Sequence, residues 1–168
     1  MFTVTRPNAL PWLVLSLAVI ALDQFTKHLA LAGLQPYQPQ AVIPGFLNWM
    51  LAFNPGAAFS FLAGADGWQR WLFTGLALVV SAVLVAWLAR TPRRDWRNAA
   101  PLALILGGAI GNLIDRLRFG HVTDFVQVYW REWAFPAFNV ADAAISIGAV
   151  MLVVFALGLG GARRDTFR

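Results

Sequence analysis

Two aspartates in apolar surroundings are the residues of this chain most suited to acid–base chemistry. Asp142 stands at the start of an apolar run that continues to Leu157, and Asp124 lies in the preceding segment GHVTDF. Two carboxyl groups held close together cannot both ionise, so they share a proton. The ionised carboxylate activates water while the protonated one polarises a carbonyl, which suffices for peptide hydrolysis without a cofactor. Asp124 and Asp142 are therefore a candidate dyad.

Further polar residues are expected at the same depth as this pair. Asn112 and Asp115 are three positions apart and share one face of a predicted helix. That helix ends, and the next one begins, on the same side of the molecule. The residues predicted to gather there are Asn112, Asp115, Arg116, Asp124, Asn139 and Asp142.

Each of these residues also has a purely structural interpretation. Asn139 and Asp142 fit an N-cap and N3 pair that starts a helix. Asp115 fits a structural ion pair, and Asp124 fits a solvated charge in a loop. Asp23 and Lys27, at positions i and i+4, fit a helix-surface pair that supports the bundle.

Other chemistries have weaker support. The chain has no cysteine, which excludes disulfides and a thiolate nucleophile. His28 and His121 are isolated and lack metal-ligand spacing, so no metal site is predicted. Lys27 is the only lysine, and a Ser/Lys hydrolase would need a serine such as Ser60 brought to it, without any motif behind it.

The elements that position these residues are predicted to span a membrane. The chain of 168 residues is 59% hydrophobic and only 12% charged, whereas a soluble domain carries about 25% charged residues. A bilayer core requires about 20 mainly apolar residues. Four such runs are expected in one domain covering residues 1–168, at about 10–34, 68–89, 99–117 and 140–159. Ala30-Leu31-Ala32 resembles a signal-peptidase site, but Asp23 and Lys27 interrupt the run before it, so the first span is expected to be retained.

The basic residues predict the orientation. Arg90, Arg93, Arg94 and Arg97 lie between the second and third spans, and Arg6, Arg163, Arg164 and Arg168 lie near the termini. The opposite loops, 35–67 and 118–139, hold only Arg118 and Arg131. The positive-inside rule therefore places both termini in the cytoplasm. Basic residues in short flanks do not form a phosphate-binding face, so no nucleic acid partner is predicted.

The two outer loops are aromatic and weakly charged. The first carries turn signals at Pro44-Gly45 and Asn54-Pro55-Gly56, with β-favouring aromatic segments between them, and the second is dense in Phe, Tyr and Trp. We expect a small β-containing platform at the headgroup level of the membrane. Segments 46–61 and 125–138 are expected to act as a lid that moves when substrate enters. The predicted fold class is thus an all-α membrane protein with four transmembrane helices and this platform.

Four segments together resemble one known family. NPGAAF (54–59), GGAIGNLIDR (107–116), GHVTDF (120–125) and FNVADAAISIG (138–148) are similar to motifs of the bacterial lipoprotein signal peptidase, or signal peptidase II. The similarity extends over essentially the whole chain, and four motifs in order make it specific.

The resemblance implies an aspartic endopeptidase of the bacterial inner membrane with its active site at the periplasmic face. Such enzymes remove signal peptides from diacylglyceryl-modified prolipoproteins just before the lipobox cysteine, without a cofactor. Asp124 and Asp142 match the catalytic pair, and the matching substrate-binding or supporting positions are Asn54, Gly56, Asn112, Asp115, Arg116 and Asn139. The family is also the target of the cyclic peptide globomycin, and membrane lipid is an implied partner.

Two other classes stay open at this point. An ion or proton transporter could use intramembrane carboxylates, although these are expected near the midplane and often in repeated halves. A non-enzymatic membrane assembly factor would account for the spans but not for convergent aspartates.

Overall fold

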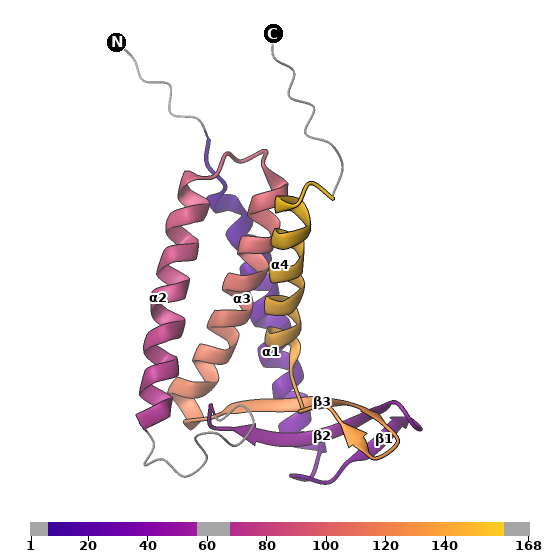
Figure 1. The fold of residues 1–168 in the computed structure, drawn as a ribbon. Helices are drawn as coiled ribbons and strands as arrows, with labels where there is room; N and C mark the ends of the chain where they lie inside the picture. Colours follow the sequence, from indigo (N-terminus) through magenta and orange to yellow (C-terminus); the bar gives the residue numbers. More distant parts are fainter. Residues whose placement is uncertain (1–6, 57–67, 160–168) are drawn as a thin grey trace, which may run out of the picture.

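Four long helices stand side by side over a small sheet (Figure 1). The computed structural model describes residues 7–56 and 68–159. A short 3-10 turn, Leu10–Trp12, leads into the first helix. The four helices are α1 (Leu13–Gly33), α2 (Trp68–Arg90), α3 (Trp96–Phe119) and α4 (Val140–Ala156).

The structure confirms the predicted all-α membrane class with a small sheet. Three helical segments, Leu10–Gly33, Arg70–Arg90 and Trp96–Phe119, are long and apolar enough to cross a membrane. α4 is also apolar but has only 17 residues. At about 1.5 Å per residue such a helix is ~26 Å long, close to the ~30 Å hydrocarbon core. It runs alongside the other three (Figure 1), so it completes the bundle.

The boundaries of α3 differ from the prediction of 99–117. Asp95 accepts a hydrogen bond from the backbone N–H of Asn98 at 3.3 Å and so caps the first turn. Gly120 ends the helix with φ +81°, a left-handed conformation that favours glycine. The helix is longer than predicted because hydropathy does not register a charged first turn.

α3 is the central helix and packs against α1, α2 and α4. Glycines allow this close approach, as the Gly107 and Gly111 spacing suggests. A Cβ at Gly107 would lie 2.8 Å from Val19 Cβ and 2.9 Å from the carbonyl oxygen of Ser16, both on α1. A Cβ at Gly111 would lie 2.7 Å from Asp23 Oδ2. Side chains at these positions would push α1 away.

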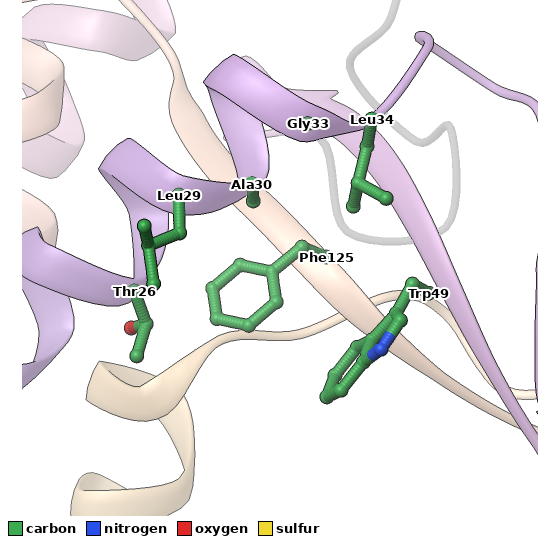
Figure 2. Close-up of a pocket in the computed structure, with 7 residues that line it drawn as sticks. All are labelled: Thr26, Leu29, Ala30, Gly33, Leu34, Trp49 and Phe125. Atoms are coloured by element: carbon green, nitrogen blue, oxygen red, sulfur yellow. The ribbon is translucent and has the colours of Figure 1, made fainter.

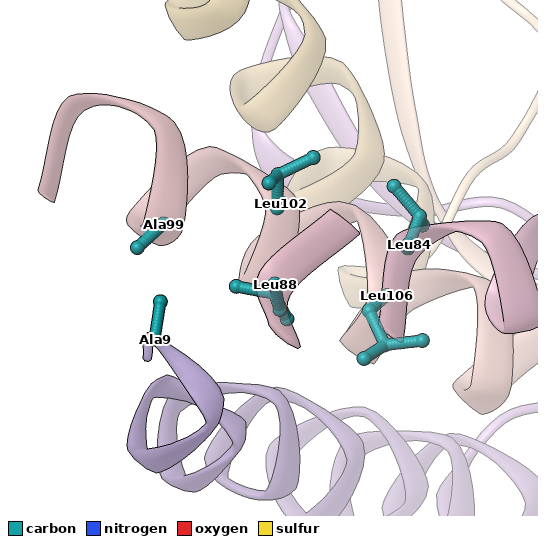
Figure 3. Packing of buried hydrophobic residues seen from close by; sticks show 6 residues of the cluster. All are labelled: Ala9, Leu84, Leu88, Ala99, Leu102 and Leu106. Carbon is teal, nitrogen blue, oxygen red and sulfur yellow. The ribbon is translucent and has the colours of Figure 1, made fainter. Parts of the chain in front are cut away.

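A buried apolar cluster closes the end of the bundle that lies farthest from the sheet (Figure 3). It consists of Ala9, Leu84, Leu88, Ala99, Leu102 and Leu106. Ala9 donates a backbone hydrogen bond to the carbonyl oxygen of Thr91 at 2.9 Å, and Arg93 donates one to that of Pro7 at 3.0 Å. The start of the first helical segment is thereby tied to the basic α2–α3 connection.

The sheet joins the two outer loops. Strands β1 (Gln40–Ile43), β2 (Leu47–Asn54), β3 (Val122–Trp130) and β4 (Trp133–Ala134) form it in the order β1-β2-β3-β4, with antiparallel pairs. β2 and β3 come from different halves of the sequence, and Asn54 pairs with Val122 while Leu47 pairs with Val128. Exposed aromatic side chains, including Trp49, Trp130 and Trp133, lie on this platform.

The predicted lid falls only in part on described residues. Residues 46–54 and 125–134 belong to the sheet or its turns. Residues 57–61, Ser60 among them, lie outside the described residues. Movement of these loops stays a prediction.

Candidate active site

The two candidate aspartates come from different elements that meet at the sheet end of the bundle. Asp124 lies in β3 and is only 2% exposed, so it is not a solvated loop charge. Asp142 lies half-buried in the first turn of α4. β3 is tied to the start of α4 because Val126 and Phe138 form an isolated bridge, with backbone hydrogen bonds of 2.9 Å in each direction.

Asn139 joins the two carboxyl groups. Its side-chain Nδ2 donates to Asp124 Oδ1 at 2.7 Å, and its backbone N–H donates to Asp142 Oδ2 at 3.2 Å. Its Oδ1 also accepts from the backbone N–H of Asp142 at 2.9 Å, which completes the capping box. Asn139 and Asp142 therefore form the N-cap and N3 pair that the sequence suggests. The hydrogen bonds of Asn139 also hold the carboxyls of Asp124 and Asp142 beside each other.

Asn112 approaches from α3. Its Nδ2 donates to Asp142 Oδ1 at 2.7 Å, and its Oδ1 accepts from Asn139 Nδ2 at 3.1 Å. Residues on β3, α3 and α4 thus share one hydrogen-bonded network. A buried network of this kind is rigid when its members are satisfied.

A charged cluster lies behind this network. Lys27 Nζ is 2.9 Å from Asp23 Oδ2 and 3.0 Å from Asp115 Oδ2. Asp23 and Lys27 do not lie on the helix surface as predicted: they are 0% and 2% exposed. The i, i+4 spacing is compatible with either location, and the glycine face of α3 is what buries the pair.

Two contributors were not identified from the sequence. Gln24 Nε2 lies 3.0 Å from Asp115 Oδ1 and 3.2 Å from Asp23 Oδ2. The Thr123 backbone N–H donates to Asp115 Oδ2 at 3.0 Å. Gln24 could have been identified from the sequence, because it is a polar residue inside an apolar span. The Thr123 contact could not, because it is made by the backbone and does not depend on the residue type.

Asn54 and Gly56 form a turn at the end of β2. Asn54 Oδ1 accepts from the Gly56 backbone N–H at 2.9 Å, and the Asn54 side chain also hydrogen-bonds Asp124. Gly56 has φ +102°, and a Cβ there would lie 2.5 Å from Phe73 Cδ2. Only glycine fits this position.

Arg116 brings a positive charge to the site. Its guanidinium carbon lies 5.6 Å from the centre of the Phe73 ring. Its charge acts on Asp142, Asp124 and Asp115. Its buried Nε has no hydrogen-bond partner among the described residues.

The carboxyl of Asp124 is held in an unusual state. Burial, and next to it the charge of Asp142, raises its pKa from 3.8 to about 7, against opposing hydrogen bonds from Asn139 and Asn54. A carboxyl that keeps its proton near neutral pH can act as a general acid.

Metal and serine chemistry find little support in the described part of the chain. No group of three His, Cys, Asp or Glu side chains there is placed to hold a metal ion. Burial lowers the pKa of His121, which packs between aromatic rings at 4.6 Å from Phe53 and 6.0 Å from Phe119. Lys27 uses its three N–H donors on Asp23, Asp115 and Asn112, so it has no role as a base for Ser60, which lies outside the described residues.

An apolar pocket of about 310 Å³ lies next to the site, between the C-terminal end of α1 and the sheet. Figure 2 shows Phe125 and Trp49 facing the last turns of α1, where Ala30 and Gly33 leave space. The one polar side chain of the lining, Thr26, donates its hydroxyl to backbone carbonyl oxygens of its own helix, at 2.8 Å for Leu22 and 3.0 Å for Asp23. The pocket therefore suits an apolar group.

The site as a whole combines two carboxyls joined by hydrogen bonds from Asn139, one with its pKa raised to about 7 by burial, with asparagine donors and a buried cation. Such a set can activate water and polarise a carbonyl. No described residue pattern offers a covalent nucleophile with an adjacent base.

Comparisons with known proteins show which family the chain belongs to. Residues 15–158 match the family model of signal peptidase (SPase) II. The lipoprotein signal peptidase of Xylella fastidiosa (strain M12) is 56% identical over 153 residues, covering 91% of this chain and 92% of that protein. That of Xanthomonas campestris pv. campestris (strain 8004) is 55% identical over 152 residues, covering 90% and 91%.

Solved structures show the same fold. A bacterial membrane enzyme solved by the in meso method at 2.3 Å resolution has a TM-score of 0.76 at 25% identity, with 98% of each chain covered. A second, at 1.9 Å resolution, has a TM-score of 0.74 at 27% identity, with 96% of this chain and 99% of that chain covered. The chain belongs to the signal peptidase II family, and it is a membrane-embedded peptidase that removes the signal peptides of lipoproteins.

Proposed function

We propose that Asp124 and Asp142 are the catalytic dyad of an aspartic endopeptidase that cleaves diacylglyceryl-modified prolipoproteins just before the lipobox cysteine. The observation that carries this proposal is the double contact of Asn139. One residue donates to Asp124 Oδ1 at 2.7 Å and to Asp142 Oδ2 at 3.2 Å, so the two carboxyls face one small volume.

The chemistry needs only the dyad and one water. The ionised carboxylate takes a proton from water, whose oxygen bonds to the scissile carbonyl carbon, while the protonated carboxyl gives its proton to the carbonyl oxygen. When the tetrahedral intermediate collapses, the C–N bond breaks, the leaving amine receives the proton that the carboxylate took from water, and the former carbonyl oxygen returns its proton to the other carboxyl. The products are the carboxyl end of the signal peptide and the free amine of the lipidated cysteine.

The substrate enters from the membrane. The dyad lies where α3 ends and α4 begins, beside the aromatic sheet, which is the level at which a lipid-anchored cleavage site meets the headgroups. The apolar pocket beside Phe125 suits part of the diacylglyceryl group. A globomycin-like cyclic peptide would inhibit by occupying the same site.

The single domain of residues 1–168 sits in the bacterial inner membrane with both termini in the cytoplasm and the site at the periplasmic face. The support is the arginine-rich α2–α3 connection at the end opposite to the sheet. A transporter is less favoured, since the carboxyls lie at helix ends and not at midplane.

Cleavage of a lipidated and an unlipidated lipobox peptide tests this function. Asp124→Asn and Asp142→Asn should each lose at least about 10²–10⁴-fold in turnover of the lipidated peptide, the usual contribution of positioned acid–base groups. Asp95→Asn is the matched control, because it makes the same change at the N-cap of α3, where asparagine also caps. Near-normal turnover by either dyad variant would remove the dyad from the mechanism.

A further inference from the structure

Lys27 is fixed in one orientation deep in the bundle. Its side chain is buried, and its three N–H donors face Asp23 Oδ2 at 2.9 Å, Asp115 Oδ2 at 3.0 Å and Asn112 Oδ1 at 3.0 Å. An ammonium group has no acceptor, so whatever atom faces it must be an acceptor. Asp23 and Asp115 form ion pairs with Lys27, and Asn112 connects Lys27 to the dyad.

The contact with Lys27 determines how the Asn112 amide is turned. Its Oδ1 accepts from Lys27 Nζ at 3.0 Å and from Asn139 Nδ2 at 3.1 Å. A flipped amide would set N–H donors against N–H donors on both sides. The Nδ2 of Asn112 must therefore point the other way, where it donates to Asp142 Oδ1 at 2.7 Å.

The two carboxyls of the dyad then stand in unequal surroundings. Asp142 receives a donor at each oxygen, Asn112 Nδ2 at Oδ1 and the Asn139 backbone N–H at Oδ2, and it lies at the positive end of the α4 dipole. Hydrogen bonds to a carboxylate favour its ionised form. Asp124 is more deeply buried, and the combination of burial and the Asp142 charge raises its pKa to about 7.

We propose that Lys27 is a positioning residue that acts through the Asn112 amide to hold Asp142 as the ionised member of the dyad, leaving the proton on Asp124. This inference rests on the proposed dyad and assigns a role to each of its members. Asp142 takes the proton from water, and Asp124 gives its proton to the carbonyl oxygen. The other charged groups that face the pair are Asp23 on α1 and Asp115 and Arg116 on α3. Arg116 acts on both carboxyls, on Asp142 more strongly than on Asp124, so its charge also favours an ionised Asp142.

The pH dependence of kcat/KM separates this role from a merely structural one. Asn112→Asp keeps an acceptor for Lys27 but replaces the donor to Asp142 with a second carboxylate. The acid limb of the profile, which reports ionisation of the base, should move to higher pH by about one unit or more, a tenfold loss of the active form on the acid side. Lys27→Met should move the limb in the same direction.

Gln24→Met is the matched control. It removes the contacts of Gln24 with Asp23, Asp115 and the Gly111 carbonyl oxygen, but Gln24 does not touch Asn112 or the dyad. It should lower the melting temperature and leave both limbs where the unaltered enzyme has them. Equal limb shifts in Gln24→Met and Asn112→Asp would overturn the inference.

A second measurement decides the matter even if Asn112→Asp has no turnover or Lys27→Met does not fold. The side-chain carboxyl ¹³C shifts of aspartate-labelled protein in detergent report directly whether each aspartate is protonated. Asp124→Asn and Asp142→Asn assign the two signals. Asp142 should be ionised and Asp124 protonated just below neutral pH, and Asn112→Asp should bring the titration of Asp142 upwards. A proton on Asp142, or an Asp142 titration unchanged in Asn112→Asp, would refute the inference while leaving the inactivity of the dyad variants, and so the proposed function, intact.

Discussion

Asp124 couples the chemistry of the site to the stability of the fold. In the folded protein its pKa is raised to about 7, mainly by burial, from a usual value of 3.8. The unfolded chain loses this proton near pH 4, whereas the folded chain keeps it up to about pH 7. Between these values the folded state binds more protons, so the contribution of Asp124 to stability is complete below about pH 4 and declines as pH rises to about 7.

Asp124→Asn should remove this pH dependence, because an amide neither ionises nor requires desolvation of a charge. Its oxygen still accepts from Asn139. The unaltered protein should therefore lose melting temperature relative to this variant as the pH rises from 4.5 to 7.5. Thermal unfolding in detergent measures it, with Asp95→Asn as the control for the substitution itself. Parallel curves would mean that Asp124 is ionised throughout.

Residue types and spacing indicated the members of the site but not all of their surroundings. The sequence grouped Asn112, Asp115, Arg116, Asn139 and the two aspartates, and the structure places them together. It did not indicate that Lys27 reaches Asn112, since a helix carries no sign of which face its neighbour covers. That face is set by Gly111, whose missing Cβ leaves room for Asp23.

At the scale of elements, the sheet brings two distant segments together beside the dyad. β3 carries Asp124 in the hydrogen-bonded network and Phe125 in the lining of the apolar pocket, so one strand contributes to both the proposed reacting centre and the pocket. Turn signals predicted β-structure in the first outer loop but not in the second, and pairing of β2 with β3 is non-local and has no local signature. The same holds for the pocket, which exists only once α1 and the sheet are in place.

Filling the pocket should weaken recognition of lipid more than catalysis. Gly33 lines the pocket and a Cβ there meets no atom within 4 Å, so Gly33→Leu adds bulk without a clash at the backbone. We expect KM for the lipidated peptide to rise several-fold while kcat changes little, because uniform binding is lost and not transition-state binding.

Gly75→Leu on α2 is the matched control, since a Cβ there also meets no atom within 4 Å and Gly75 does not line the pocket. Both variants exchange a helical glycine for leucine, so they gain similar helix propensity. Identical KM values in the two variants would show that the pocket holds bulk membrane lipid and not the substrate.

At the scale of the whole molecule, the two ends of the bundle differ in character. One end carries the arginines of the α2–α3 connection, tied to the start of the first helical segment by Arg93 and Pro7. The other end carries the aromatic sheet, and the arginine at the start of α2 there, Arg70, donates to the carbonyl oxygen of Leu117 at 2.9 Å at the end of α3. The positive-inside rule counts arginines in short loops between spans, so the end with the α2–α3 connection is the one expected in the cytoplasm.

The chain has no cysteine, so single cysteines introduced at the two ends can be labelled without background. Glu132→Cys lies in the exposed turn between β3 and β4, and Arg94→Cys lies in the exposed α2–α3 connection. With the arginine-rich end in the cytoplasm, an impermeant thiol reagent should label Glu132→Cys in cells whose outer membrane has been permeabilised, and Arg94→Cys only after lysis. The reverse pattern would put the dyad on the cytoplasmic side, where a substrate whose cleavage site lies in the outer leaflet cannot reach it, and orientation and proposed mechanism would fail together.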